Sequence, residues 1–321
     1  MKKNALRLIF GCISLYLCSI TVFAAGMLVP GGQVIGLELN DDTVTVVAFD
    51  DCLRAGRDAG LQIGDEICAI DGHTIRTAED VRRALNSSDG SVDMTVERGG
   101  KSRQIHLEPE ITSDGPKLGV FLRQGITGIG TVTCYDPESG SFATLGHAVS
   151  DGKGRLLQMT QGNVYPATVV SVQRGKSGAP GQLKGALDTD VLLGQLTNNT
   201  ARGVFGTAPQ LCAGEAIPVA QWSEVHQGSA TIRSTVDKGQ PRDYCVEIIK
   251  IYPPNRSDGR NMLLRVTDPD LLAATGGIVQ GMSGSPIIQD GKLVGAVTHV
   301  LVNDPQSGYG IFIENMLDAA A

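Results

Sequence analysis

Aromatic side chains are scarce in this chain, and so are long stretches without glycine. Phe, Trp and Tyr make up only 4% of the 321 residues, whereas glycine occurs 41 times, about twice its usual share. This composition disfavours a protein built from long helices and is typical of one with many short strands and turns. The length leaves room for about two domains with sizeable cores.

The chain also lacks a basic block and cysteine pairs at metal-binding spacing. Its formal net charge is −7, so the sequence predicts no basic patch that would bind nucleic acid. Cys12 and Cys18 lie near the N-terminus, which leaves five cysteines beyond them and no CxxC pair. The pattern predicts neither a disulfide framework nor a zinc site, and buried free thiols or a single bridge stay open. It indicates no metal and no cofactor.

The N-terminus has the charge order of an export signal. Lys2, Lys3 and Arg7 precede an uncharged apolar run at residues 8–25, which predicts that the chain leaves the cytoplasm or is anchored facing out. The run is barely long enough for a transmembrane helix, and its small-residue cleavage site is mediocre. Residues 1–26 are therefore interpreted as a signal or membrane anchor, with a slight preference for the anchor.

Residues 27–110 read as a small β-rich module with one helix. Thr77 is placed to cap a helix that runs through Leu85, with Asp80 completing a capping box. A glycine-rich phrase at residues 60–67 (Gly-Leu-Gln-Ile-Gly-Asp-Glu-Ile) comes before this helix, and an alternating strand at 92–98 follows it. The order of these elements resembles a PDZ domain, a small α/β fold.

The PDZ resemblance implies a peptide-binding groove. A carboxylate, or a polar stretch of an internal peptide, would be received by the backbone of a loop made of Val34, Ile35, Gly36 and Leu37. The ligand would add as a strand beside the one that begins at Leu37, facing Val81 and Leu85 of the helix. The alternative for these apolar side chains is plain core packing.

Residues 111–321 change to short strands punctuated by glycine, with Pro, Asn and Asp in the turns. Strands at this density predict a β-barrel or a pair of barrels. Taken together, the chain is expected to be mainly β, with a small α/β PDZ domain followed by a barrel domain.

The segment 281–286 (Gly-Met-Ser-Gly-Ser-Pro) is the strongest chemical signal. Its glycines allow a sharp turn in which amide N–H groups can point into one concavity. An apolar run, an Asp290-Gly291 turn and a second apolar run follow, so Ser283 is expected on a β-hairpin. A similar segment at 175–180 (Gly-Lys-Ser-Gly-Ala-Pro) lacks these strands and is interpreted as a loop.

A serine nucleophile needs a base, because its hydroxyl is protonated at neutral pH. The chain has five histidines: His73, His106, His147, His226 and His299. His147 is favoured, since it follows an apolar strand at a glycine-flanked bend, whereas His73, His106 and His226 lie in polar or surface-exposed contexts.

A carboxylate is expected to fix the tautomer of the base. Asp188 and Asp190 follow His147 at roughly the spacing of a two-barrel serine protease. Asp268 instead closes an apolar strand shortly before Ser283. Spacing alone does not choose between them.

Three segments resemble the SpoIVB peptidase family: residues 144–151 (Thr-Leu-Gly-His-Ala-Val-Ser-Asp), 281–286 and 295–305 (Gly-Ala-Val-Thr-His-Val-Leu-Val-Asn-Asp-Pro). The resemblance spans nearly the whole chain. It implies a trypsin-like double β-barrel peptidase at 111–321, with His147 as base, Asp268 as orienting acid and Ser283 as nucleophile. The amides of Gly281 and Ser283 would form the oxyanion hole.

The resemblance further implies a role in endospore formation. Members of the family are understood to cross the forespore membrane, facing the intermembrane space, and to cleave their own N-terminal region. They then cut a regulator of an intramembrane protease, which leads to activation of a sigma factor. Met282 and Ser285 depart from the Gly-Asp-Ser-Gly-Gly-Pro of trypsin-like enzymes, and Met282 cannot form their usual ion pair with a freed N-terminus. The alternative is an inactive PDZ-containing signalling scaffold.

Overall fold

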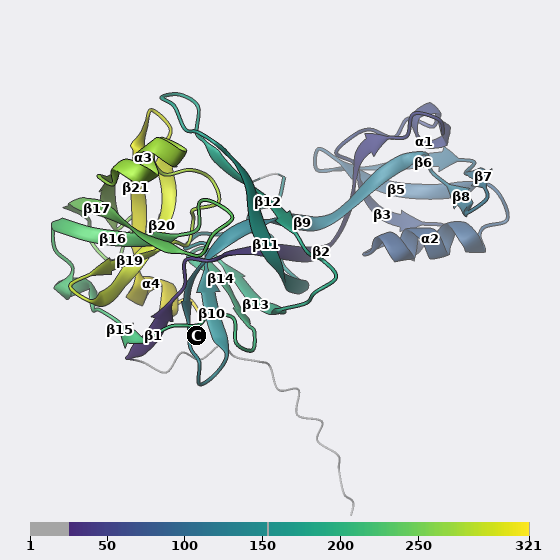
Figure 1. Cartoon of the computed structure of the whole chain (residues 1–321). Coiled ribbons are helices and arrows are strands. Elements are labelled where there is room, and N and C mark those ends of the chain that lie inside the picture. The colour runs from purple at the N-terminus through teal and green to yellow at the C-terminus, as the bar shows by residue number, and fades with distance from the viewer. Residues whose placement is uncertain (1–25, 153, 321) are drawn as a thin grey trace, which may run out of the picture.

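The computed structural model describes residues 26–152 and 154–320 of the chain. The predicted signal or anchor lies almost wholly outside the described residues, and within them no helix is long and apolar enough to cross a membrane. Figure 1 shows a large β-rich body and a small one, joined by the two long strands β2 (Val34–Phe49) and β9 (Val120–Tyr135).

The first barrel is a closed ring of six antiparallel strands. In order around the ring these are β2, β9, β10 (Ser141–Thr144), β14 (Gly203–Thr207), β13 (Gly194–Thr200) and β11 (Gln161–Gln173), and the pairing of β11 with β2 closes it. Its core includes Phe142 and Val204, both inaccessible to solvent. On the outside, β1 (Met27–Pro30) joins β9 to β15 (Ile217–Pro218), and β12 (Gln182–Leu187) pairs with β11.

The second barrel also has six strands. They follow the order β16 (Gly228–Ser234), β17 (Arg242–Ile251), β18 (Met262–Val266), β21 (Asp304–Phe312), β20 (Lys292–Leu301) and β19 (Pro286–Gln289). Ile232, Ile248 and Phe312 fill its interior. The short helix η1 (Trp222–Glu224) precedes β16, α3 (Pro269–Thr275) connects β18 to β19, and α4 (Ile313–Leu317) follows β21. The predicted double β-barrel is confirmed.

The small body is the predicted PDZ domain. The outer halves of β2 and β9 continue into a sheet with β3 (Glu66–Ile70), β5 (Val92–Arg98) and β6 (Lys101–Leu107). Its remaining elements are α1 (Ala55–Asp58), β4 (His73–Thr74), α2 (Ala78–Ser87), β7 (Glu110–Thr112) and β8 (Gly115–Lys117). The capping box at the start of α2 is confirmed, because the Thr77 hydroxyl accepts from the Asp80 amide and the Asp80 carboxylate accepts from the Thr77 amide, both at 3.0 Å.

The PDZ domain is inserted into a hairpin of the first barrel, which differs from the predicted succession of residues 27–110 and 111–321. Residues 34–39 pair with β11 and β9 inside the barrel, and only from Val44 onward does β2 belong to the PDZ sheet. The chain returns at residues 120–124, which also pair within that sheet. Alternating apolar residues predict a strand but do not reveal its partners, so the boundaries could not be read from the pattern.

Candidate active site

Ser283 lies in a tight turn between α3 and β19. Gly281 and Gly284 have φ angles of 97° and 96°, which side chains rarely tolerate. A Cβ atom on Gly284 would lie 2.0 Å from the Thr131 carbonyl oxygen. The turn therefore requires glycine beside the serine, both for its conformation and for its close approach to β9.

Strand β9 of the first barrel holds this turn. The Thr131 amide donates to the Ser283 carbonyl at 3.1 Å, and the Thr131 hydroxyl donates to the Gly281 carbonyl at 2.8 Å. The Thr133 hydroxyl donates to the Gly284 carbonyl at 2.8 Å. The nucleophile of one barrel is thus positioned by the other barrel.

Along this turn, amides that donate a backbone hydrogen bond alternate with amides that do not. The Met282 amide donates to the Val279 carbonyl and the Gly284 amide to the Val297 carbonyl. Within the described residues, the amides of Gly281 and Ser283 form no hydrogen bond. These two amides, on either side of the bonded Met282 amide, are the kind of donors that stabilise an oxyanion. Met282 itself is fully buried in the barrel core, where it serves packing.

His147 comes from the first barrel through a strained bend. Leu145 and Gly146 both have a φ of 68°, and a left-handed leucine is unusual. A Cβ on Gly146 would lie 2.9 Å from the Thr298 methyl carbon, so this bend packs tightly against the second barrel. His147 and Ser283 line one cavity of about 450 Å³ between the barrels.

The tautomer of His147 is set by its own backbone neighbour. Its Nδ1 lies 2.8 Å from the Ala148 carbonyl oxygen, so Nδ1 carries the proton of the neutral ring and Nε2 is left as an acceptor. Burial lowers the pKa of His147, which the hydrogen bond to Ala148 partly opposes. The ring is therefore neutral at pH 7, as a general base must be.

Ser283 is in a resting orientation. Its hydroxyl donates to the Thr298 carbonyl at 2.8 Å, and within the described residues it makes no hydrogen bond to His147. A rotation about the Cα–Cβ bond has to release this hydroxyl before His147 can accept its proton.

The predicted acid, Asp268, does not line this cavity, and no contact between Asp268 and His147 is found within the described residues, so its role as the orienting acid stays a prediction. Asp268 caps α3: one oxygen accepts from the Asp270 and Leu271 amides at 3.0 Å, and the other accepts from the Cys245 amide at 3.2 Å. The alternatives Asp188 and Asp190 lie in an exposed turn after β12. An aspartate directly before a Pro-initiated helix is itself a capping signal.

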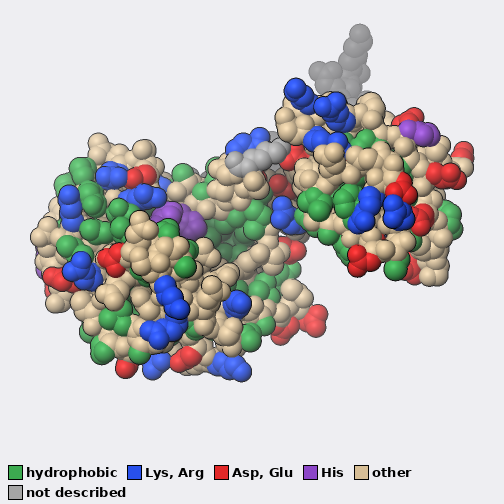
Figure 2. Space-filling view, turned by 90° about the horizontal axis from the view of Figure 1, so that it is seen from above, with side chains coloured by type: hydrophobic (Ala, Val, Ile, Leu, Met, Phe, Trp, Pro, Cys, Tyr) green, Lys and Arg blue, Asp and Glu red, His purple; other side chains and the backbone are tan. Residues whose placement is uncertain are grey.

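His299 is the residue that sequence reasoning missed. It lies on β20, next to Thr298, and its ring centroid is 5.2 Å from that of His147, at an interplanar angle of 42°. Figure 2 shows histidine side chains gathered on one face of the barrel body. The sequence did contain a signal for His299, because this residue lies on the second strand of the hairpin that follows Ser283, and that strand must pass beside the serine.

The serine-containing segment at 175–180 is a turn between β11 and β12, as expected. The Ser177 hydroxyl donates to the Asn303 carbonyl at 2.9 Å, and Lys176 pairs with Ala179. This serine is therefore structural.

The predicted peptide-binding loop is not part of the PDZ domain. Val34, Ile35, Gly36 and Leu37 lie in the barrel half of β2, and the side chains of Ile35 and Leu37 are buried in the first barrel. Val81 and Leu85 are buried in the PDZ core instead. The structure therefore does not bring these two groups together.

A different loop has the geometry for a peptide carboxylate. Residues 117–120 (Lys-Leu-Gly-Val) lead into β9, whose residues 120–124 pair with β2 and with no other strand of the described ranges. Helix α2 lies along this part of β9, since the Ala78 amide donates to Gln124 at 3.3 Å. Gly119 has a φ of 69°, and no hydrogen bond from the Leu118 or Gly119 amide is found in the described part of the chain. An apolar-Gly-apolar triplet before a strand was the sequence signal.

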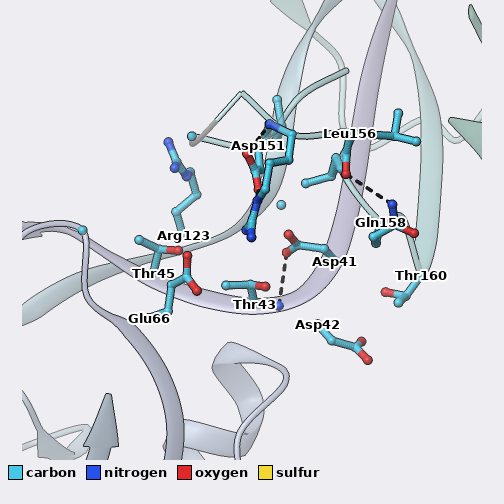
Figure 3. Close-up of a pocket in the computed structure, with 16 residues that line it drawn as sticks. Asp41, Asp42, Thr43, Thr45, Glu66, Arg123, Asp151, Leu156, Gln158 and Thr160 are labelled. Atoms are coloured by element: carbon cyan, nitrogen blue, oxygen red, sulfur yellow. Dashed lines mark hydrogen bonds and ion pairs between the residues drawn. The ribbon is translucent and has the colours of Figure 1, made fainter. Parts of the chain in front are cut away.

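A larger cavity of about 880 Å³ lies between the barrel body and the PDZ domain (Figure 3). Its walls come from β2, β9 and the segment after the His147 bend. Arg155 of that segment pairs with Asp151 at 2.8 Å, and Asp41 on β2 accepts from the Thr43 amide at 3.2 Å. The segment that follows His147 faces the PDZ domain across this cavity, whose lining also includes Gly64 and Glu66 of that domain.

Comparison with known proteins identifies two families. The SpoIVB peptidase S55 profile matches residues 114–317, and a PDZ domain profile matches residues 55–98. Two curated proteins named as zinc metalloproteases are similar over part of their length. The one from Agrobacterium fabrum is 30% identical over 167 residues, 52% of this chain and 41% of that protein. The one from Rhizobium meliloti is 31% identical over 157 residues, 48% and 39% of the two.

This chain therefore spans about two fifths of the length of these curated relatives. Within the described ranges, no cluster of three or more His, Cys, Asp or Glu residues could hold a metal ion. Among solved structures, the PDZ domain of an SdrC-like protein from Listeria monocytogenes is 25% identical, with a TM-score of 0.22, and covers 25% of this chain and 87% of that one. The Rv3671c protease from M. tuberculosis is 17% identical, with a TM-score of 0.34, and covers 61% and 73%.

Proposed function

Because this chain belongs to the SpoIVB peptidase S55 family, we propose that it is a serine endopeptidase with Ser283 as nucleophile and His147 as general base. The observation that carries the proposal is that both side chains line one cavity, and that Ser283 lies on a turn in which the Gly281 and Ser283 amides form no hydrogen bond to any described residue. Because the two residues are far apart in the sequence, their placement in one cavity depends on the packing of the two barrels.

In the proposed reaction, each of these groups has one role. Ser283 leaves the Thr298 carbonyl and gives its proton to Nε2 of His147 as its oxygen attacks the peptide carbonyl carbon. The developing oxyanion accepts from the amides of Gly281 and Ser283. His147 then gives the proton to the leaving amine, and water hydrolyses the acyl-enzyme by the same route in reverse.

The PDZ domain supplies a second, non-catalytic contact with protein substrates. A bound peptide would add to β9 at residues 120–124 and face Val81 and Leu85 of α2, with its terminal carboxylate at the amides of Leu118 and Gly119. Its ligand would be a substrate protein or the N-terminal region of this chain.

The biological setting is proposed from family membership and from residues 1–26. The enzyme would be exported during endospore formation and be associated with the forespore membrane, facing the intermembrane space, through its N-terminal segment. It would cleave itself and then a regulator of an intramembrane protease, so that sigma-factor activation follows.

Storage of the purified chain tests the chemistry. The wild type is expected to shorten from its N-terminal side and to cut an added unfolded protein, whereas Ser283→Ala stays intact and inactive. Ser177→Ala is the matched control, because it removes the serine of the similar structural turn. Identical fragmentation of wild type and Ser283→Ala would refute the proposal.

Two observations favour the alternative of an inactive scaffold. Within the described residues no carboxylate contacts His147, and the Ser283 hydroxyl is bound to Thr298. Labelling with a fluorophosphonate probe separates the two functions. Labelling of wild type but not of Ser283→Ala indicates an activated serine, and absence of labelling together with absence of cleavage supports the scaffold.

A further inference from the structure

Two segments of the second barrel, residues 278–280 and 298–300, line the catalytic cavity. In the proposed reaction His147 gives its proton to the leaving amine, so the leaving half of the substrate lies beside the histidine bend. The oxyanion accepts from the Gly281 amide, and residues 278–280 lead directly into Gly281. The residue whose carbonyl is attacked therefore presents its side chain to the two segments of the second barrel.

Ile278 closes this part of the cavity at its deep end. Its side chain is only 2% exposed, and its amide donates to the Pro305 carbonyl at 2.8 Å. A Cβ atom on Gly308 of β21 would lie 2.6 Å from Cδ1 of Ile278, so the tip of the isoleucine fills the space that this glycine leaves. Because Ile278 lines the cavity and Gly308 does not, the isoleucine stands between the cavity and β21.

Val300 narrows the same place from the neighbouring strand. It is the cross-strand partner of Gly308, and cross-strand partners project from the same face of a sheet. Val300 is half-buried and lines the cavity together with Ile278. Two branched aliphatic side chains therefore limit the depth that a substrate side chain can reach.

The cavity also offers no partner for a charged side chain of the substrate. Among the lining residues within the described ranges, the titratable ones are His147 and His299. Burial lowers the pKa of both rings, so both are neutral at pH 7. Arg260 and Asp258, whose charges act on the His299 ring, do not line the cavity. A charged substrate side chain would lose its water here without gaining an ion pair, which carries a large cost.

We propose that Ile278 sets the specificity of this peptidase: the residue on the acyl side of the scissile bond must carry a small, uncharged side chain, such as that of alanine or valine. The inference rests on the proposed function, because it takes Ser283 as nucleophile and Gly281 as an oxyanion donor. A larger side chain needs the space that the tip of Ile278 occupies. In a hydrophobic pocket one methylene changes kcat/KM by about 10–200-fold, so this space is enough to select a substrate class.

Peptides that differ only in the residue before the cleaved bond test this specificity, with mass spectrometry to verify the bond. On the wild type, kcat/KM for alanine or valine is expected to exceed that for phenylalanine, lysine and aspartate by at least about tenfold. Ile278→Val removes Cδ1, the atom that packs on Gly308. It is expected to raise the ratio of kcat/KM for leucine to that for alanine by about tenfold.

Ile287 provides a matched control in the same barrel core. It is also fully buried, and its Cδ1 lies 2.7 Å from the place of a Cβ atom on Gly310, two residues along β21 from Gly308. Ile287 does not line the cavity. Ile287→Val removes the same carbon and is expected to leave the leucine-to-alanine ratio unchanged. Urea unfolding of each variant verifies that it is folded.

The outcomes separate this inference from the proposed function. If the wild type cleaves through Ser283 but prefers phenylalanine, lysine or aspartate, only the inference is refuted. If the leucine-to-alanine ratio stays at the wild-type value in Ile278→Val, or moves equally in Ile287→Val, Ile278 does not set the specificity.

A wild type that cleaves none of these peptides contradicts the proposed function, and peptidyl phosphonates that carry alanine or phenylalanine beside the phosphorus then decide on the pocket. Faster labelling of Ser283 by the alanine compound supports the role of Ile278. Faster labelling by the phenylalanine compound, or labelling by neither, refutes it.

Discussion

Asp268 gives the sharpest test of the site, because two roles predict opposite results for one substitution. As the third member of a triad it would fix the tautomer of His147, and Asp268→Asn would reduce kcat about 10⁴-fold. As the N-cap of α3 it needs only oxygen acceptors, and asparagine caps helices as well as aspartate does. The contacts of Asp268 favour the second role, so Asp268→Asn is expected to retain kcat within a few-fold.

The expected loss of stability on substituting Asp268 follows from the three hydrogen bonds that its side chain accepts. Asp268→Asn keeps the oxygen that accepts from the Asp270 and Leu271 amides and loses the one that accepts from Cys245, a cost of about 0.5–1 kcal/mol. Asp268→Ala loses all three, and we expect it to lower the free energy of unfolding by ~1–2 kcal/mol. Any loss of activity in Asp268→Ala should therefore accompany a loss of stability.

Urea unfolding and peptide hydrolysis are measured side by side on the wild type, Asp268→Asn and Asp268→Ala. The capping role requires that activity follow stability across the three proteins. An Asp268→Asn protein with wild-type stability but a thousandfold lower kcat would refute the reasoning. It would mean that the start of α3 moves to His147 in the working enzyme.

Three further predictions follow from individual contacts. Gly284→Ala places a Cβ against the Thr131 carbonyl at a φ of 96°, and we expect it to lower the unfolding free energy by ~2–4 kcal/mol and to abolish cleavage; a stable, active variant would contradict the close approach. A peptide with an apolar C-terminus should shift the NMR signals of the Leu118 and Gly119 amides and leave that of Ile35 unchanged, whereas the reverse pattern would restore the loop at 34–37. Burial lowers the pKa of His299 below its unfolded value of about 6.5, so on acidification the unfolded chain binds a proton before the folded chain does. The Tm should therefore fall between pH 7 and pH 5, and it should fall less in His299→Phe. Equal falls of the Tm in the two proteins would argue against a buried neutral ring.

Local patterns were sufficient for the parts of the molecule that depend on neighbouring residues. The glycines around Ser283 predict its turn, because only a residue without a Cβ adopts these φ angles so close to another strand. Thr77 and Asp80 predict the start of α2, since a capping box is made by residues three apart. The alternation of apolar residues gives the all-β character of the barrels in the same way.

Residues 34–37 show where local patterns fail. The phrase Val-Ile-Gly-Leu reads as a glycine loop entering a strand, and the strand does exist as part of β2. Its partners are β11 and β9 of the first barrel. These strands follow about a hundred positions later in the chain, so the residues around position 35 do not reveal them. The apolar-Gly-apolar triplet that leads into the proposed peptide site of the PDZ domain occurs instead at residues 118–120.

Neighbouring residues were enough to predict the elements, the serine turn and the histidine bend, because each depends on backbone preferences and hydrogen bonds within a few residues. Which groups share the cavity depends instead on how the two barrels pack. The tertiary structure brought Ser283 of one barrel to His147 of the other, kept Asp268 at the start of α3 and set His299 against the base. These placements depend on the pairing of strands far apart in the chain, whose contacts are fixed by the packing of two closed barrels.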